Sequence, residues 1–195
     1  VWARIRPMMA DGLGQDRLEQ QLGLNIERDF DHVMAFLAPG PTPGQPAGLV
    51  LLRGRFDMTR LEAVAREGGA TVSDYAGTRV VSIEADDVGA LAMAALEPGL
   101  VAAGDLASVH QAIDGLSAGS DIRANEQMMG LLERVESGSN AWVVGQLGGL
   151  SSLGIFPDEV TGQMPAVTAF ALGAHVNDGV GGSLSIEGRD EEAGQ

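Results

Sequence analysis

The alternation of apolar and polar positions is clearest between residues 47 and 84. It opens with Leu49–Leu52, an apolar run typical of a strand inside a sheet. Apolar residues then recur at helical spacing behind Asp57, whose carboxylate suits an N-cap, and the pattern stops at Gly68–Gly69. The predicted elements are a strand at 49–56, a helix at 57–67, a strand at 70–75, a turn at 75–78 and a strand at 80–83.

The order of these elements leaves two arrangements open. The helix at 57–67 joins two extended segments, so one arrangement makes strands 49–56 and 70–75 parallel neighbours through a right-handed crossover. A split arrangement, in which a strand lies between them, is equally allowed. Nothing in the stretch is placed for chemistry, so we interpret it as a scaffold.

The same criteria predict further elements along the chain. The helices are expected at 1–23, 105–116 and 125–136, with one helical turn at 26–30 and a short helix at 157–161. The strands are expected at 33–37, 91–96, 100–103, 141–147, 166–176 and 180–187, the last two forming a hairpin across Asn177-Asp178-Gly179. Pro39–Pro46 holds four prolines and is predicted to be a loop.

Together these elements predict an α+β fold with a mostly antiparallel sheet packed by helices on one side. We expect a first α+β unit at 1–116 and a second, incomplete unit at 117–195, with one continuous domain as the alternative. The order helix, strand, strand and acidic cap occurs in both units, at 1–67 and again at 125–192. This order suggests that the two halves are related by a weak internal repeat.

Charge narrows the classes of partner. The chain has 12 basic residues, all Arg, against 27 acidic ones, for a net charge of −15. Such a surface repels phosphate backbones, so we predict no nucleic-acid partner. The absence of Cys excludes disulfides, thiolate metal sites and a Cys nucleophile.

The chain contains no apolar run of the ~20 residues needed to span a bilayer. It begins at Val1 without Met and ends in an acidic tail. We therefore expect a trimmed chain, with a signal peptide or a membrane tether possible upstream.

No pattern of residues indicates a metal, a cofactor or a catalytic group. The three histidines, His32, His110 and His175, lie in different elements and have no second ligand at metal-site spacing. We interpret them as surface or capping residues. The prediction is no catalytic, cofactor-binding or metal-binding residue.

Three groups of acidic residues leave an alternative open. A hydrolase of the glycosidase type needs two carboxyl groups across a cleft. The candidates are Asp29 and Asp31, Asp86 and Asp87, and Asp190, Glu191 and Glu192. All of them fall at predicted element boundaries, where acids commonly serve as caps, and none fits the EF-hand pattern for Ca²⁺.

Two loops are the places where a site is most expected, because regular structure ends there. One is the Pro-rich loop, and the other is the Gly-rich segment 145–156. The second follows a strand but lacks the GK[ST] and GxGxxG patterns of phosphate loops, so we interpret it as a flexible loop. The pairs Met8/Met9 and Met128/Met129 are interpreted as core packing.

The region from about 47 to 116 resembles a loose group of uncharacterised exported bacterial proteins. The shared pattern comprises a G-x-F-D strand end, a Y-x-G turn, a glycine hairpin followed by Asp and a helix ending in A-[IL]-D. The matching positions are Gly54, Phe56 and Asp57; Tyr75 and Gly77; Gly99, Gly104 and Asp105; and Ala112, Ile113 and Asp114. The resemblance implies an extracytoplasmic α+β protein, often a lipoprotein or membrane-tethered, and it transfers no catalytic residue.

Three functions remain open on these grounds. The first is a non-enzymatic module of the cell envelope, periplasmic or at the cell surface, that binds another protein or a ligand through its sheet or the concavity between its halves. The second is a hydrolase that uses paired carboxylates. The third is a carrier of a small ligand or lipid in an apolar cavity, suggested by the Met- and Ala-rich helices.

Overall fold

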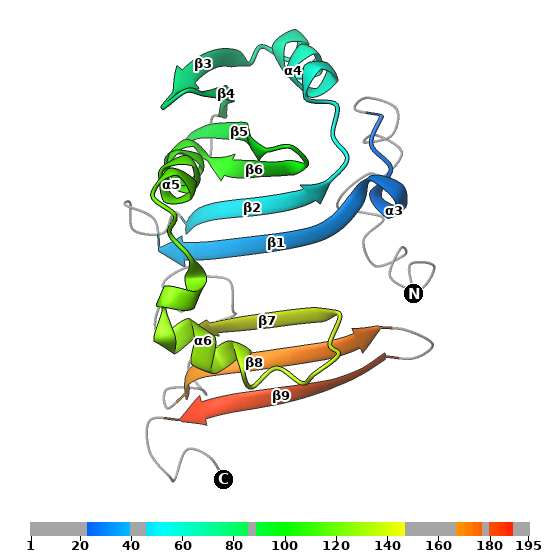
Figure 1. The fold of residues 1–195 in the computed structure, drawn as a ribbon, viewed down its shortest axis with the longest axis vertical. Helices are drawn as coiled ribbons and strands as arrows, with labels where there is room; N and C mark the ends of the chain where they lie inside the picture. The colour runs from blue at the N-terminus through cyan, green and yellow to red at the C-terminus, as the bar shows by residue number, and fades with distance from the viewer. Residues whose placement is uncertain (1–22, 40–45, 86–88, 147–166, 177–179, 189–195) are drawn as a thin grey trace. The chain divides into compact units, whose positions relative to one another are not determined.

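The computed structural model describes residues 23–39, 46–85, 89–146, 167–176 and 180–188. Contacts divide the chain into two compact units: Ile5–Leu37 with Ala47–Ser120, and Val1–Arg4 with Ala38–Pro46 and Asp121–Gln195. Each is built on one sheet, so we call them the six-stranded unit and the three-stranded unit (Figure 1). The α+β fold with mostly antiparallel sheets is confirmed.

The six-stranded sheet has the strand order β1-β2-β6-β5-β4-β3. Every pair from β2 to β3 in that order is antiparallel. The elements of this unit are α3 (Ile26–Asp29), β1 (Phe30–Pro39), β2 (Pro46–Gly54), α4 (Met58–Glu67), β3 (Thr71–Tyr75), β4 (Thr78–Ala85), β5 (Gly89–Glu97), β6 (Leu100–Asp105) and α5 (Leu106–Ser117).

Of the two arrangements left open for strands 49–56 and 70–75, parallel neighbours are not the observed one. β2 and β3 run in the same direction, but β6, β5 and β4 lie between them. The reason is the β5–β6 hairpin, whose tight turn at Pro98–Gly99 carries β6 back to pair with β2 in the register Leu51↔Ala102. The split arrangement is therefore the observed one, with three intervening strands.

Helix α5 and one face of the sheet form the core of this unit. Val80 and Ala94 are opposite one another on β4 and β5, and both are nearly inaccessible to solvent. Val109 and Ile113, one turn apart on α5, pack against them. Because residues four apart share a helix face, this pair is the apolar side that the sequence predicted.

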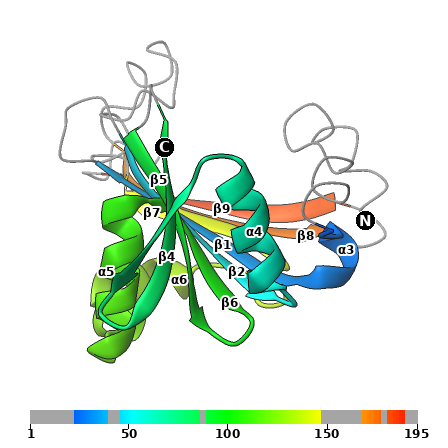
Figure 2. The ribbon, with the colours of Figure 1, turned by 90° about the horizontal axis from the view of Figure 1, so that it is seen from above.

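Helix α4 lies against the other face of the sheet (Figure 2). Its N-terminus is capped by Asp57, whose carboxylate accepts from the backbone N–H of Arg60 at 3.1 Å. Leu61 is buried, and Glu62 pairs with Arg79 of β4, which points to the face opposite Val80. Helix α5 is thus the helix packed along β5 and β6, and α4 reaches the opposite side of the sheet at β4.

Two glycines permit close approaches that any side chain would block. A Cβ at Gly104 would lie 2.1 Å from the carbonyl oxygen of Gly48 on the paired strand. A Cβ at Gly54 would lie 2.0 Å from the carbonyl oxygen of Asp29. These glycines therefore fix how closely β6 and α3 approach β2.

The three-stranded unit consists of a small antiparallel sheet, order β7-β8-β9, with helix α6 on one face. Its elements are η2 (Ile122–Ala124), α6 (Glu126–Leu132), β7 (Ala141–Gln146), β8 (Val167–Val176) and β9 (Val180–Gly188). The helix buries Leu131, and the middle strand buries only small residues, Ala169, Ala171 and Gly173. A Cβ at Gly173 would lie 2.6 Å from Ser139 Oγ, so the segment after α6 lies close to this face.

Several predicted elements differ in length from those observed, and others lie outside the described residues. Helix 125–136 is shorter than predicted, since α6 ends at Leu132 and is followed by a turn at 133–134 and a bend at 135. The strand predicted at 33–37 extends to Phe30–Pro39. Helix 1–23 lies almost entirely outside the described residues and the short helix at 157–161 wholly so, and the internal repeat stays a prediction for that reason.

Candidate functional site

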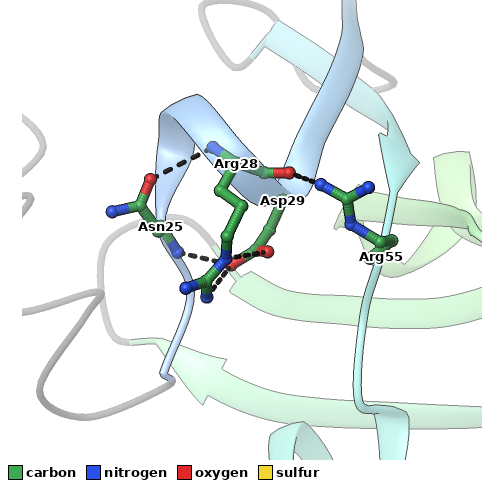
Figure 3. A network of polar contacts seen from close by, with 4 residues as sticks. All are labelled: Asn25, Arg28, Asp29 and Arg55. Atoms are coloured by element: carbon green, nitrogen blue, oxygen red, sulfur yellow. Dashed lines mark hydrogen bonds and ion pairs between the residues drawn. The ribbon is translucent and has the colours of Figure 1, made fainter.

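The densest polar network in the described residues joins Asn25, Arg28, Asp29 and Arg55 (Figure 3). The first three belong to α3 and its cap, and Arg55 follows β2. The Asp29 carboxylate accepts from Arg28 Nε at 2.8 Å and from Arg28 Nη2 at 2.9 Å. It also accepts from the backbone N–H of Asn25 at 2.8 Å, while Arg55 Nη2 donates to the carbonyl oxygen of Arg28.

Local chain geometry explains why these groups meet. The Asn25 side chain accepts from the backbone N–H of Arg28 at 3.1 Å, which starts the single turn of α3. Asp29 closes the turn, and the N–H of Arg55 donates to its carbonyl oxygen at 2.8 Å. The absence of a side chain at Gly54 allows this contact, so the network attaches α3 to the end of β2.

Electrostatics shows what this carboxylate can do. The hydrogen bond from Arg28, with help from that of Asn25, lowers the pKa of Asp29 from 3.8 to about 2. A general acid or base working near neutral pH needs a pKa close to that pH, which usually means a raised carboxyl pKa. Asp29 is buried, ionised and fully engaged, so its role is to hold the backbone.

The other candidate acids do not join Asp29 in a cleft within the described part of the chain. Asp31 is exposed on β1. Asp86, Asp87, Asp190, Glu191 and Glu192 lie outside the described residues. The two loops proposed as sites, 39–46 and 145–156, also lie mostly outside them.

The histidines occupy three separate structural positions. His32 is exposed on β1. The ring of His110 on α5 stacks on Tyr75 with 3.7 Å between centroids and an interplanar angle of 4°. His175 Nδ1 lies 3.0 Å from the carbonyl oxygen of Gly138, and its Nε2 lies 3.4 Å from Glu136. Among the described residues no three His, Asp or Glu side chains are grouped to hold a metal ion.

Sequence reasoning missed the cluster of Tyr75, His110 and Asp114. The Tyr75 hydroxyl donates to Asp114 at 2.9 Å, and this hydrogen bond raises the pKa of Tyr75. The spacing of His110 and Asp114 places them on one face of α5, which was visible in the sequence. Their meeting with the end of β3 was not, because it depends on how α5 packs across the sheet.

The residues of the shared pattern have structural roles in the six-stranded unit. Phe56 packs edge-to-face on Phe30 at 5.3 Å between centroids, and Gly77 occupies a turn with φ of 80°. Asp105 caps α5 through the N–H of Ser108 at 2.9 Å and also accepts from the N–H of Gly48 at 2.8 Å. These roles account for the pattern without a site.

Sequence reasoning also missed an apolar surface on the three-stranded sheet. Side chains alternate along a strand, so the face opposite α6 carries the residues that the helix does not cover. We call it the apolar sheet face, and it comprises Val143, Phe170, Leu172, Leu184 and Ile186. All except the half-buried Phe170 are exposed.

No family model, curated protein or solved structure matches the chain. Among the described residues, no helix is both long and apolar enough to cross a membrane.

Proposed function

We propose that the chain is a non-enzymatic binding module of the bacterial cell envelope that recognises another protein through the apolar sheet face. The observation that carries the proposal is the exposure of this face: Val143 is 53% exposed and Leu184 is 61% exposed. Contiguous exposed apolar side chains on a soluble unit commonly mark an interaction surface. Placement outside the cytoplasm rests on the resemblance over residues 47–116.

The pattern of the face supports a protein partner. Leu172 lies opposite Val143 on one neighbouring strand and opposite Leu184 on the other, so the three form a continuous row across the sheet. Such a row offers an apolar sheet surface with no charged side chain in it. A sheet surface of this kind suits packing by another sheet or by an amphipathic helix, whereas small molecules favour concave sites.

The structural roles of Asp29, Asp57 and Asp105 also support binding over hydrolysis. Asp29 is ion-paired, and Asp105 and Asp57 are helix caps. A hydrolase with paired carboxylates would need two such groups free to face a substrate.

The test is site-specific photo-crosslinking in cells that produce the full chain. A photoreactive residue replaces Leu184 on the apolar sheet face, and a matched variant carries it at Thr71, which is exposed on β3. We expect a discrete adduct with one protein from position 184, absent at position 71 and abolished when Leu172→Glu is added. A crosslink from 184 into the same chain, or equal adducts from both positions, would reject the proposal.

A further inference from the structure

The two edge strands of the six-stranded sheet differ in their protection. An edge strand presents unpaired backbone N–H and C=O groups that can pair with another strand. β3 is a short edge of five residues, TVSDY, whose Asp74 opposes such pairing. β1 is an edge of ten residues, and from Val33 to Pro39 it contains no charged side chain.

The side chains of β1 are exposed on both of its faces. Val33 and Leu37 project to one face and are 61% and 56% exposed. Met34 and Phe36 project to the other face and are 39% and 37% exposed. Natural edge strands usually carry Lys or Pro in such a stretch, and β1 has neither before its terminal Pro39.

Charge indicates what can approach this edge. The chain carries a net charge of −15, so two copies repel each other over most of their surfaces. From Val33 to Leu52 the sequence contains no ionisable side chain. The β1 edge is therefore a place where two copies meet without bringing carboxylates together.

We infer that β1 is a self-association edge that pairs antiparallel with β1 of a second copy, around a two-fold axis at Ala35. In this register Val33 lies opposite Leu37 of the second copy, and Met34 lies opposite Phe36. Each pair occurs twice, as a two-fold interface requires. Branched aliphatic pairs and Met–aromatic pairs are both favourable across strands.

The position of Asp31 selects the antiparallel arrangement. A parallel pairing in register would place Asp31 beside Asp31 of the second copy, at the strand spacing of about 5 Å. In the antiparallel register Asp31 lies opposite Pro39. The two Asp31 residues are then about 27 Å apart along the strands, which is well beyond the Debye length of about 8 Å.

Size and symmetry define the kind of complex. One strand pair buries less than the ~1,200–2,000 Å² of a standard stable interface, so the dimer is expected to depend on protein concentration. In the two-fold pairing, the β1 edges of both copies are hydrogen-bonded to each other. The remaining edges of the two six-stranded sheets are the β3 strands, which are protected. The complex therefore closes at two copies.

The experiment is sedimentation of the full chain from about 1 µM to 1 mM, comparing Ala35→Glu and Ala35→Lys alone and mixed. Ala35 is exposed, so both changes are compatible with folding. We expect a reversible monomer–dimer equilibrium for the unchanged chain. Each variant alone should shift the midpoint at least tenfold to higher concentration, because like charges meet at the axis. The mixture should restore dimers.

The matched control is Ser73→Glu on β3, which adds the same charge to the other edge and should leave the midpoint unchanged. A monomer at every concentration would overturn the inference. So would a dimer insensitive to Ala35→Glu, a mixture that fails to restore pairing, or growth beyond two copies. Leu172→Glu on the apolar sheet face should not alter the dimer, so this test is independent of the proposed function.

Discussion

The six-stranded unit and the three-stranded unit bury their apolar residues differently. In the first, α5 packs on one sheet face, and Val80, Val109 and Ile113 there are almost wholly buried. In the second, α6 lies on the face where the middle strand carries the small residues Ala169, Ala171 and Gly173, and the other face keeps Leu184 and Ile186 exposed. The six-stranded unit therefore buries a core under α5 and leaves its exposed apolar side chains mainly on the edge strand β1, whereas the three-stranded unit leaves them across a whole sheet face.

The largest expected effect tests the close approaches that belong to the six-stranded unit. Gly54→Ala would place a Cβ 2.0 Å from the carbonyl oxygen of Asp29, and backbone cannot yield as a flexible side chain can. We expect a loss of about 3 kcal/mol in the free energy of unfolding. Urea titration followed by circular dichroism measures it.

The matched glycine lies in the other unit. Gly130 is in the middle of α6, and a Cβ added there would meet no other atom within 4 Å. Gly130→Ala should therefore stabilise by about 0.5–1 kcal/mol, because alanine favours the helix. Equal effects at the two glycines would contradict the packing described for β2 and α3.

The second prediction compares apolar truncations in the two units. Ile113→Ala removes a side chain that is 2% exposed from the α5 core, with an expected loss of about 3 kcal/mol. Ile186→Ala removes one that is 48% exposed, with an expected change within about 0.5 kcal/mol. Thermal and urea unfolding of both variants give the comparison. A large loss at Ile186 would show that the apolar sheet face is covered within the molecule.

The third prediction concerns helix caps. Asp105 caps α5 and also binds the N–H of Gly48, so it links a helix to the neighbouring β2 strand. Asp105→Ala should cost about 2 kcal/mol. Asn125 caps α6 only locally, through the N–H of Met128 at 3.0 Å, and Asn125→Ala should cost about 1 kcal/mol. A larger loss for Asn125→Ala than for Asp105→Ala would contradict the prediction, because the hydrogen bond from Gly48 would then add nothing to stability.

The fourth prediction is a pH effect. The hydrogen bond from Arg28 lowers the pKa of Asp29 to about 2, below the value of about 3.9 in an unfolded chain. Its contribution to stability is thus complete above pH 4 and is lost as pH falls from about 4 to 2. The Asp29→Asn variant should be less stable at neutral pH and lose less on acidification across this window. Urea midpoints at pH 2, 3, 4 and 7 would show whether the two curves converge.

Asp105 contributes in the same direction. Burial raises the pKa of Asp105, but the hydrogen bonds from Ser108 and Gly48 together lower it by more than burial raises it. The pKa of Asp105 therefore lies below the ordinary value. The Asp29→Asn variant should therefore keep part of the acid sensitivity, which a second change, Asp105→Asn, would reduce. Unchanged acid sensitivity in the double variant would place its origin elsewhere.

The sequence predicted most elements of the fold because their signals are local. The cap at Asp57, the Tyr75–Thr78 turn and the helical spacing on α5 depend on neighbouring residues only. The strand order was not predicted, since the pairing of β6 with β2 joins segments about fifty residues apart. Gly104 carries no local sign that a carbonyl oxygen lies against it.

The candidate site was less predictable, for a related reason. Asp29 was named as a candidate acid for hydrolysis, but its engagement with Arg28 and Asn25 was not predicted, because it depends on side-chain geometry. The apolar sheet face was not recognised, although Leu184 and Ile186 alternate with polar residues on β9. Alternation shows that one face is apolar, but only the position of α6 shows that it is the uncovered one.

Tyr75, which stacks on His110, and Trp142 are two different fluorescent side chains, one in each unit. Tyr75 is the single tyrosine of the chain and lies between β3 and α5, whereas Trp142 lies on β7 of the other unit. With the second tryptophan, Trp2, replaced by Phe, excitation at the red edge of absorption, where tyrosine does not absorb, follows the three-stranded unit alone. The tyrosine emission band, which lies at shorter wavelength than that of tryptophan, follows the six-stranded unit. A titration with denaturant would then reveal, without any added dye, whether the units unfold together or one after the other.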